Sequence, residues 1–195
     1  MNDATNLNPP SALHLIEEAT KAIGFTMMSD HLTGSLLRTL ATSKPIGNFL
    51  ELGTGTGLAT AWLLDGMDIH SKLLTVDNDE ALLATAKKFL QSDARLKICA
   101  SDGGGFIEDL IKGGQKFDLI FADTWAGKYT HFDEALSLLK IGGLYVIDDL
   151  LPQPNWPEDH PQKVASLIQT LEENQNFQVT KLNWSTGLII AVKIN

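Results

Sequence analysis

Cysteine is almost absent from this chain of 195 residues, which contains only Cys99. A single cysteine can form neither an internal disulfide nor a zinc site of several cysteines, so a disulfide-stabilised scaffold is excluded. Basic residues are also few, with 15 Lys and Arg against 24 Asp and Glu and a formal net charge of −9. A chain this acidic lacks the broad basic surface that phosphate contacts need. We therefore expect neither nucleic acid nor an anionic membrane as a partner.

Long apolar stretches are missing as well. Runs such as 188–192 are far shorter than the roughly 20 residues that cross a bilayer. The first ten residues are polar and end in Pro9 and Pro10, unlike a secretory signal. Together with the single cysteine, these features predict a cytoplasmic protein. Hydrophobic residues make up 44% and charged residues 20% of the chain, which is typical of a globular domain.

From residue 48 onward, short apolar runs alternate regularly with segments of helical periodicity. The runs that are typical of buried strands are 48–52, 72–76, 96–100, 117–122 and 144–147. Helical periodicity follows Asp79, Lys128 and Pro161, and Gly142 and Gly143 are predicted to end the second of these helices. The alternation predicts an α/β fold, a three-layer sandwich in which helices cover both faces of a mostly parallel sheet.

The two ends of the chain differ from this pattern. The β-like runs 177–182 and 187–193 are joined by a short turn-prone linker, which predicts an antiparallel C-terminal hairpin and a seven-stranded sheet. Ahead of residue 48, the apolar spacing predicts two helices, with Ser29 and Asp30 as candidate caps of the second. We therefore divide the chain into an N-terminal helical extension, 1–47, that packs on a single core domain, 48–195.

The most informative stretch is a glycine-rich turn between the first strand and the next helix. Gly53, Gly55 and Gly57 stand at every second position, with Thr54 between the first two. Such a turn brings bare backbone against a ligand, with the N–H groups of a helix behind it. Asp77 comes twenty residues after Gly57 and directly follows the second strand, where it can accept hydrogen bonds from ribose hydroxyls. The combination predicts a cofactor that contains a nucleoside.

The spacing in this turn separates two kinds of cofactor. The nicotinamide dinucleotide fingerprint needs a small residue three positions after its second glycine, where this chain has Leu58. The turn instead resembles the E/D-x-G-x-G-x-G signature of class I S-adenosylmethionine (SAM)-dependent methyltransferases. The resemblance implies a Rossmann-like methyltransferase fold, whose last two strands are similar to the C-terminal hairpin, and SAM as the cofactor. It further implies that the cofactor is bound by Glu51, Gly53, Thr54, Gly55, Gly57, Asp77 and Asn78.

A second segment similar to this family follows the third strand. The sequence Ala100-Ser101-Asp102-Gly103 resembles the segment that contacts adenine, which implies that Asp102 and Gly103 bind the cofactor. From the residues alone, Asp102 is equally well the N-cap of the next helix, and both roles can hold together. Asn78 and Asp79 carry the same two alternatives.

Three carboxylates follow strands at the edge of the sheet where open α/β proteins bind ligands. Asp123 comes after the fourth strand, and Asp148 and Asp149 come after the fifth. Carboxylates that converge repel one another unless they are protonated, separated or neutralised by a cation. Mg²⁺ or Ca²⁺ suits a site that has only oxygen ligands.

The segments that carry these acids resemble the metal-dependent small-molecule O-methyltransferases of the catechol and caffeoyl-coenzyme A type. Residues 117–129 follow the motif F-D-x-I-F-I-D-A-D-K-x-x-Y, and residues 138–149 follow a second motif that ends in D-N. The resemblance implies a divalent metal on Asp123, Asp148 and Asp149, with Asp123 also near the methionine end of SAM. Trp125 and Ala126 replace an acid and a lysine of the motif, and Asp149 replaces its asparagine. A site without metal is therefore the alternative.

The sequence thus predicts SAM-dependent methyl transfer to an oxygen atom of a small molecule. Asp123 is one candidate catalytic residue, and Lys128 is a candidate general base, although a lysine at a helix start is more often exposed. A homodimer is compatible with the sequence. The alternatives are a protein that binds the cofactor but has lost the chemistry, and a metal-independent N-methyltransferase.

Two groups of aromatic and imidazole side chains complete the candidates. Trp125 and Trp156, the latter in the proline-rich loop 151–161, can stack on a planar substrate. Alternatively, Trp156 only anchors that loop to the core. The five histidines show no metal-ligand spacing and are predicted to lie at the surface or to cap helices.

Overall fold

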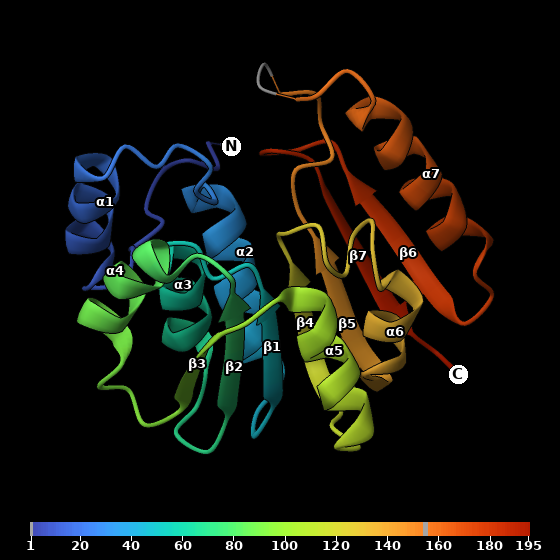
Figure 1. Cartoon of the computed structure of the whole chain (residues 1–195), viewed down its shortest axis with the longest axis horizontal. Helices are drawn as coiled ribbons and strands as arrows, with labels where there is room; N and C mark the ends of the chain where they lie inside the picture. The colour runs from blue at the N-terminus through green and yellow to red at the C-terminus, as the bar shows by residue number, and fades with distance from the viewer. Residues whose placement is uncertain (1, 154–155) are drawn as a thin grey trace.

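The computed structural model describes residues 2–153 and 156–195. In this part of the chain the helices are α1 (Leu13–Ala22), α2 (His31–Thr42), α3 (Leu58–Gly66), α4 (Glu80–Leu90), α5 (Gly103–Lys112), α6 (Phe132–Ser137) and α7 (His160–Glu173). The strands are β1 (Asn48–Leu52), β2 (Lys72–Asp77), β3 (Leu96–Ala100), β4 (Phe117–Ala122), β5 (Leu139–Ile147), β6 (Phe177–Leu182) and β7 (Leu188–Lys193). Strands and helices alternate from β1 to β6, as the apolar pattern predicts (Figure 1).

All the strands belong to one seven-stranded sheet, in the order β3-β2-β1-β4-β5-β7-β6. The first five strands are parallel, whereas β7 runs antiparallel to both β5 and β6. This confirms the predicted mostly parallel sheet with an antiparallel C-terminal hairpin. The strand order reverses at β1, which pairs with both β2 and β4. Such a reversal opens a crevice at the carboxyl ends of the strands, where ligands bind in open α/β folds.

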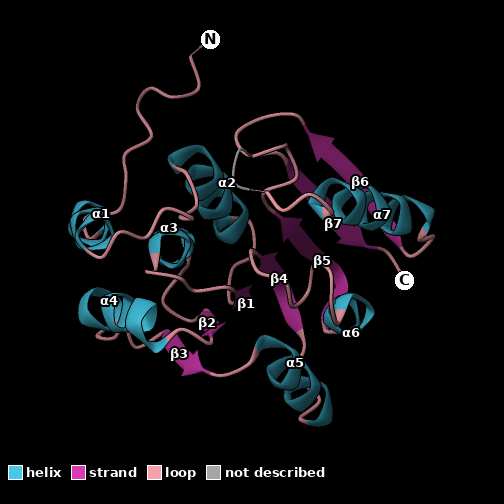
Figure 2. Ribbon diagram, turned by 45° about the horizontal axis from the view of Figure 1, so that its top comes forward, coloured by secondary structure: helices cyan, strands magenta, loops and turns pink. Residues whose placement is uncertain are grey.

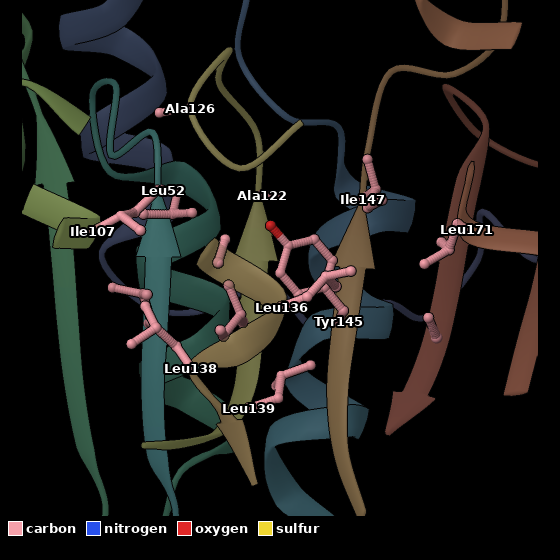
Figure 3. Packing of buried hydrophobic residues seen from close by; sticks show 14 of the residues in the cluster. Leu52, Ile107, Ala122, Ala126, Leu136, Leu138, Leu139, Tyr145, Ile147 and Leu171 are labelled. Atoms are coloured by element: carbon pink, nitrogen blue, oxygen red, sulfur yellow. The ribbon is translucent and has the colours of Figure 1, made fainter. Parts of the chain in front are cut away.

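Helices cover both faces of the sheet, so the molecule has three layers and an apolar core on each face (Figure 2). One core joins residues of α1, α2, α3 and α4 to the strands, and Trp62 is the largest fully buried side chain in it. The other joins residues of α5, α6 and α7 to the opposite face. Figure 3 shows Tyr145 of β5 in this second core, near Leu136 and Ile147. The predicted three-layer sandwich is confirmed.

The two N-terminal helices contribute to the first core. Ile16 of α1 and Leu37 of α2 are fully buried there. Gly34 lets α2 approach α3 closely, because a Cβ atom at this position would lie 2.2 Å from the Trp62 ring. The Asp30 carboxylate caps α2 by accepting a hydrogen bond from the backbone N–H of Thr33 at 2.8 Å, as the sequence predicts. The division of the chain at residue 47 stays a prediction.

The expectations for the segment between Lys128 and β5 are wrong in two respects. Helix α6 covers only Phe132–Ser137, and β5 already begins at Leu139. Gly142 and Gly143 do not end a helix but lie within β5, where Gly142 has a φ of 77° and the register with β4 shifts. A glycine with positive φ suits a helix end and a β-bulge equally, so its presence in the sequence does not separate the two.

Candidate active site

A cavity of about 730 Å³ lies at the carboxyl ends of β1, β2, β4 and β5. Its walls come from the glycine turn after β1, the turn after β2, the ends of β4 and β5, and the loop between α1 and α2. The volume is in the range of small-molecule and cofactor sites. The strand reversal at β1 therefore coincides with a cavity.

The three glycines of the turn have different tasks, although all have positive φ, at 101°, 52° and 94° for Gly53, Gly55 and Gly57. A Cβ atom at Gly53 would lie 2.8 Å from the carbonyl oxygen of Asp123, and one at Gly57 would lie 3.0 Å from Ala86 of α4. Gly55, which lines the cavity as Gly53 does, is less crowded, because a Cβ atom there would lie no closer than 3.6 Å to another side chain. The outer glycines permit close packing, and the middle one presents backbone to a ligand.

Asp77, at the end of β2, lines the cavity and is hydrogen-bonded to the glycine turn that follows β1. Its Oδ2 accepts a hydrogen bond from the N–H of Gly55 at 2.8 Å, and its Oδ1 accepts one from the N–H of Asp79 at 3.0 Å. A carboxylate offers about four acceptor positions, so lone pairs remain for the hydroxyls of a ligand. Asn78 and Thr54 line the same cavity. The structure thus brings together most of the residues that the resemblance assigns to SAM.

Glu51 lies beneath the glycine turn and does not line the cavity. It is fully buried, and its Oε2 accepts hydrogen bonds from the hydroxyls of Thr60 at 2.5 Å and Thr75 at 2.6 Å. Its Oε1 has no hydrogen-bond partner among the described residues. Burial raises the pKa of Glu51 to about 8, so the side chain is neutral at pH 7. The structure therefore gives Glu51 the task of joining β1, β2 and α3 under the turn.

Asp102 and Gly103 lie at the start of α5, and neither lines the cavity as far as the described residues show. The Asp102 carboxylate accepts a hydrogen bond from the N–H of Gly105 at 2.9 Å and so caps the helix. Of the two alternatives for Asp102, the structure shows the capping role. A contact with adenine stays a prediction.

Asp123, Asp148 and Asp149 do converge, and we call them the acidic cluster. The Oδ2 of Asp123 accepts a hydrogen bond from the hydroxyl of Ser29 at 2.9 Å. Asp148 is 1% exposed, and its Oδ1 accepts hydrogen bonds from the N–H of Asp149 at 2.8 Å and from the hydroxyl of Thr186. Burial, followed by the charges of the other two acids, raises the pKa of Asp148 to about 7. Burial also raises the pKa of Asp149, which lines the cavity.

Lys128 is buried at this cluster, so the expectation of an exposed lysine is wrong. The Trp125 carbonyl accepts hydrogen bonds from the N–H groups of Lys128, Tyr129 and Thr130, at 3.2, 2.8 and 3.1 Å. This tight turn folds Lys128 back over the end of β4, where its side chain is 5% exposed and its Nζ lies 3.2 Å from Oδ1 of Asp123. Burial alone would lower the pKa of Lys128, but the three carboxylates raise it overall. A lysine that stays protonated is not suited to be a general base.

The acidic cluster does not fit the divalent metal that the sequence motifs imply. Within residues 2–153 and 156–195, no group of three or more His, Cys, Asp or Glu side chains is arranged to hold a metal ion. Both oxygens of Asp123 already accept hydrogen bonds, one from Ser29 and one from the Lys128 ammonium. The Oδ1 of Asp148 accepts two more. Both oxygens of Asp123 and the Oδ1 of Asp148 are therefore engaged by groups of the chain itself.

Aromatic side chains form another wall of the cavity. Trp125, Tyr129, Trp156 and His160 all line it, and the ring centroids of Trp156 and His160 are 4.4 Å apart. His160 is buried, and its Nε2 lies 3.2 Å from the Tyr129 hydroxyl, so the expectation of a surface or capping histidine is wrong. Trp156 packs against the core and also lines the cavity, so it anchors its loop, and stacking on a substrate stays a prediction. Residues 154 and 155 of its loop lie outside the described residues.

Sequence reasoning missed two contributors to the cavity. The loop between α1 and α2 supplies Phe25, Met27 and Met28 to its wall, in addition to Ser29. Thr186, in the turn between β6 and β7, binds Asp148. No motif marks these residues, because each lies in a loop far along the chain from the acids. The apolar residues at 25–28, which continue no helical stripe, are the one signal that points to the first loop.

The strand order, the glycine turn and the position of the cavity are those of the Rossmann-like methyltransferase fold. A sequence model for a family described as O-methyltransferase matches residues 4–194. The chain belongs to this O-methyltransferase family.

Individual relatives agree with this assignment. A catechol O-methyltransferase of Niastella koreensis is 30% identical over 123 residues, which cover 60% of this chain and 56% of the relative. The chain spans about half the length of several of the curated relatives it matches. The O-methyltransferase TomG of Streptomyces achromogenes, solved in complex with SAM, has a TM-score of 0.83 at 20% identity, covering 95% of this chain and 90% of that one. An O-methyltransferase of Bacillus cereus, solved with SAH, has a TM-score of 0.83 at 19% identity, covering 94% and 90%. At these identities, the structural likeness shows the fold.

Proposed function

We propose that the chain transfers the methyl group of SAM to an oxygen atom of a small molecule. The observation that carries this proposal is the O-methyltransferase family match over residues 4–194, on a chain whose glycine turn faces a cavity. Other solved structures of this fold were determined with SAM or SAH. The cofactor belongs in the part of the cavity that the glycine turn forms.

The residues around the turn suggest how SAM lies. Asp77 ends β2 and Asn78 follows it, and we assign both to the ribose, while the backbone of Gly55 would face the cofactor. Asp123 follows β4 on the other side of β1, so the methionine end of SAM would point toward it. In this orientation the methyl group lies between the glycine turn and the acidic cluster.

The reaction then needs little covalent chemistry from the protein. The hydroxyl oxygen of the substrate attacks the methyl carbon, the C–S bond breaks with its electrons on sulfur, and S-adenosylhomocysteine leaves. The hydroxyl proton passes to a carboxylate of the acidic cluster, of which Asp123 and Asp149 line the cavity. Positioning of the two reactants can contribute about 7 to 11 kcal/mol to lowering the barrier. The donor atoms of the cluster do not fit a divalent metal, so we assign none to this reaction.

The walls beyond the acidic cluster favour a planar substrate. Trp125, Tyr129 and Trp156 line this part of the cavity, and the rings of Trp125 and Tyr129 pack edge to face. Such side chains bind flat rings through stacked or edge-to-face contacts. A hydroxylated aromatic compound is therefore the substrate class we propose, and the relative named catechol O-methyltransferase is consistent with it.

Calorimetric titration and a methyl-transfer assay test the proposal. We expect SAM to bind and NAD not to bind, and we expect methyl transfer to at least one member of a panel of catechols and hydroxycinnamates. Failure to bind SAM at millimolar concentration would overturn the proposal. Binding without transfer to any hydroxyl or amine would favour the alternative of a cofactor-binding protein. Transfer to amines alone would favour an N-methyltransferase.

We further propose a cytoplasmic location and a homodimer. The single cysteine supports a cytoplasmic location, and among the described residues no helix combines the length and apolar character needed to cross a membrane. The net charge of −9 supports a protein that does not bind nucleic acid. A homodimer stays a proposal, which sedimentation of the purified chain tests.

A further inference from the structure

The acidic cluster places three carboxylates in a region with little access to water. The side chain of Asp123 is 12% exposed, and Asp148 is 1% exposed. Repulsion between carboxylates is weakly screened in such a place, so a buried group of this kind needs a positive charge beside it. Lys128 supplies one, because its ammonium lies 3.2 Å from Oδ1 of Asp123.

The fold holds Lys128 in this position through its neighbour Gly127. Gly127 has a φ of 89°, and a Cβ atom there would lie 2.5 Å from Leu52 at the end of β1. Its carbonyl oxygen accepts a hydrogen bond from the hydroxyl of Tyr145 at 2.6 Å, and Tyr145 is fully buried in the core. The turn that carries Lys128 is thus held by contacts with Leu52 of β1 and Tyr145 of β5. The Lys128 ammonium therefore belongs to the acidic cluster and is not an exposed surface charge.

The same contacts oppose a second cation at Asp123. A divalent metal at Asp123 would have to displace the Lys128 ammonium from Oδ1 and the Ser29 hydroxyl from Oδ2. It would also be repelled by the ammonium if that group stayed. Asp149 is a carboxylate where the resembled motif has asparagine. The three positions Asp123, Asp148 and Asp149 therefore carry one more acid than the same positions of the motif. Lys128 balances that added charge.

We propose that the Lys128 ammonium is the resident cation of the acidic cluster, in the place where a divalent metal would otherwise bind. The chain consequently binds no divalent cation there, and methyl transfer proceeds without one. The part about methyl transfer rests on the proposed function, whereas the part about cation binding does not. Lys128 also lines the cavity, so an N–H of its ammonium can donate to the oxygen of a bound hydroxyl group. It would then stabilise the negative charge that develops on that oxygen.

Manganese titration of the full chain tests the binding part directly. After treatment with a chelator, free Mn²⁺ is measured by electron paramagnetic resonance for the wild type, Lys128→Met and Lys128→Arg. The matched control is Lys140→Met, which breaks a Lys–Asp pair of 2.7 Å between β5 and Asp118 at the opposite edge of the sheet. We expect weak, equal binding by the wild type, Lys128→Arg and Lys140→Met. Lys128→Met should gain one site that binds at least about tenfold tighter, because ligand charge sets the affinity of carboxylate sites.

The gain in Lys128→Met must come from the acidic cluster, so adding Asp123→Asn should abolish it. Tight Mn²⁺ binding by the wild type would overturn the proposal. The proposal would also fail if Lys128→Met showed native circular dichroism and unchanged SAM affinity but no gain in Mn²⁺ binding. If Lys128→Met does not fold, the wild type and Lys128→Arg decide, because tight binding by either contradicts a resident cation and weak binding by both supports it.

Methyl transfer provides a second readout. With the resident lysine, activity should be unchanged by EDTA. In Lys128→Met activity should fall roughly 100-fold, as for removal of a single oxyanion-stabilising donor, and Mg²⁺ should restore part of it. Loss of wild-type activity on chelation would overturn the proposal. If the chain binds no SAM at all, the proposed function fails, but the Mn²⁺ result still decides the identity of the cation.

Discussion

The two halves of the cavity are built from different parts of the chain. The cofactor half is made largely of backbone, in the consecutive residues of the glycine turn together with Asp77. The acidic half is made of side chains that come from the α1–α2 loop, the ends of β4 and β5 and the β6–β7 turn. A half built from backbone tolerates few substitutions. The acidic half is built from side chains, so substitutions can change the cation that neutralises its carboxylates while the carboxylates themselves are kept.

The two halves also treat buried acids differently. Under the glycine turn, Glu51 keeps its proton because burial disfavours its charged form and the two hydroxyls that face it offset this only in part. In the acidic cluster, Lys128 supplies a positive charge, although Asp148 still titrates near neutral pH. The acid that joins elements of the fold is thus neutralised by its own proton. The carboxylates at the substrate side are neutralised by an ammonium group. The following variants separate the two halves.

The largest effect is expected for Gly53→Ala in the cofactor half. Its φ of 101° is unfavourable for a side chain, and the new Cβ would lie 2.8 Å from the carbonyl oxygen of Asp123. We expect a loss of about 2 to 4 kcal/mol in the free energy of unfolding and no measurable SAM binding. Urea denaturation and calorimetry measure the two effects.

The matched control is Gly114→Ala, at a φ of 65° with no atom within 4 Å of the new Cβ. It should cost about 1 kcal/mol from the backbone alone and leave SAM affinity unchanged. Equal losses in the two variants would mean that the close approach of the glycine turn to β4 is not important.

Asp77→Ala tests whether the cofactor half depends on this single side chain. Removal of the carboxylate takes away the bond to Gly55 and the acceptors for the ribose. We expect SAM to bind about 30-fold to 100-fold more weakly, which corresponds to the loss of one or two charged hydrogen bonds. The KM for the methyl acceptor should stay unchanged.

Asp102→Ala is the comparison for Asp77→Ala, because Asp77 ends β2 and Asp102 comes shortly after the end of β3. As the cap of α5, Asp102 contributes about 1 kcal/mol to stability. If it only caps, SAM affinity stays at the wild-type value. A tenfold loss of SAM affinity would instead establish the predicted contact with adenine.

Glu51→Gln tests the protonated acid beneath the glycine turn. The pKa of Glu51 rises from 4.5 to about 8 on burial, so between these values the unfolded chain releases a proton that the folded chain keeps. Folding is therefore favoured at low pH, and the contribution of Glu51 decreases as pH rises, by about 1.4 kcal/mol per pH unit in this window. The difference in unfolding free energy between Glu51→Gln and the wild type should change by that amount. A difference that does not vary with pH would show that Glu51 is ionised in the folded chain.

The cofactor half could be predicted because its information is local. The glycines, Thr54 and Asp77 lie within 25 residues, and each strand end is marked by a short apolar run. The alternation of runs and helices likewise predicted the mostly parallel sheet, and the two β-like runs at the end of the chain predicted the C-terminal hairpin. Even so, the sequence placed Glu51 among the cofactor contacts. An acid at this position can face the ligand or lie under the turn, and only packing distinguishes the two.

The acidic half could be predicted only in part. The position of three acids after β4 and β5 was enough to bring them together. The burial of Lys128 was not predictable, because it depends on three N–H groups that share the Trp125 carbonyl and on the distant Tyr145 hydroxyl. His160 was misjudged for a similar reason, since aromatic rings from separate segments bury it. Contacts between segments far apart in sequence leave no periodic signal.

The smallest effect is expected for Tyr129→Phe, at the aromatic wall of the cavity. The variant keeps the ring, which packs edge to face against Trp125 with centroids 5.3 Å apart, and removes only the hydroxyl, which lies 3.2 Å from Nε2 of His160. One neutral hydrogen bond contributes about 1 kcal/mol, so we expect the KM for the methyl acceptor to rise about fivefold. SAM affinity should not change, because Asp77 and the glycine turn lie on the other side of the cavity. Steady-state kinetics at saturating SAM measure the first effect and calorimetry the second. A variant with weaker SAM binding and an unchanged acceptor KM would show that the aromatic wall belongs to the cofactor half.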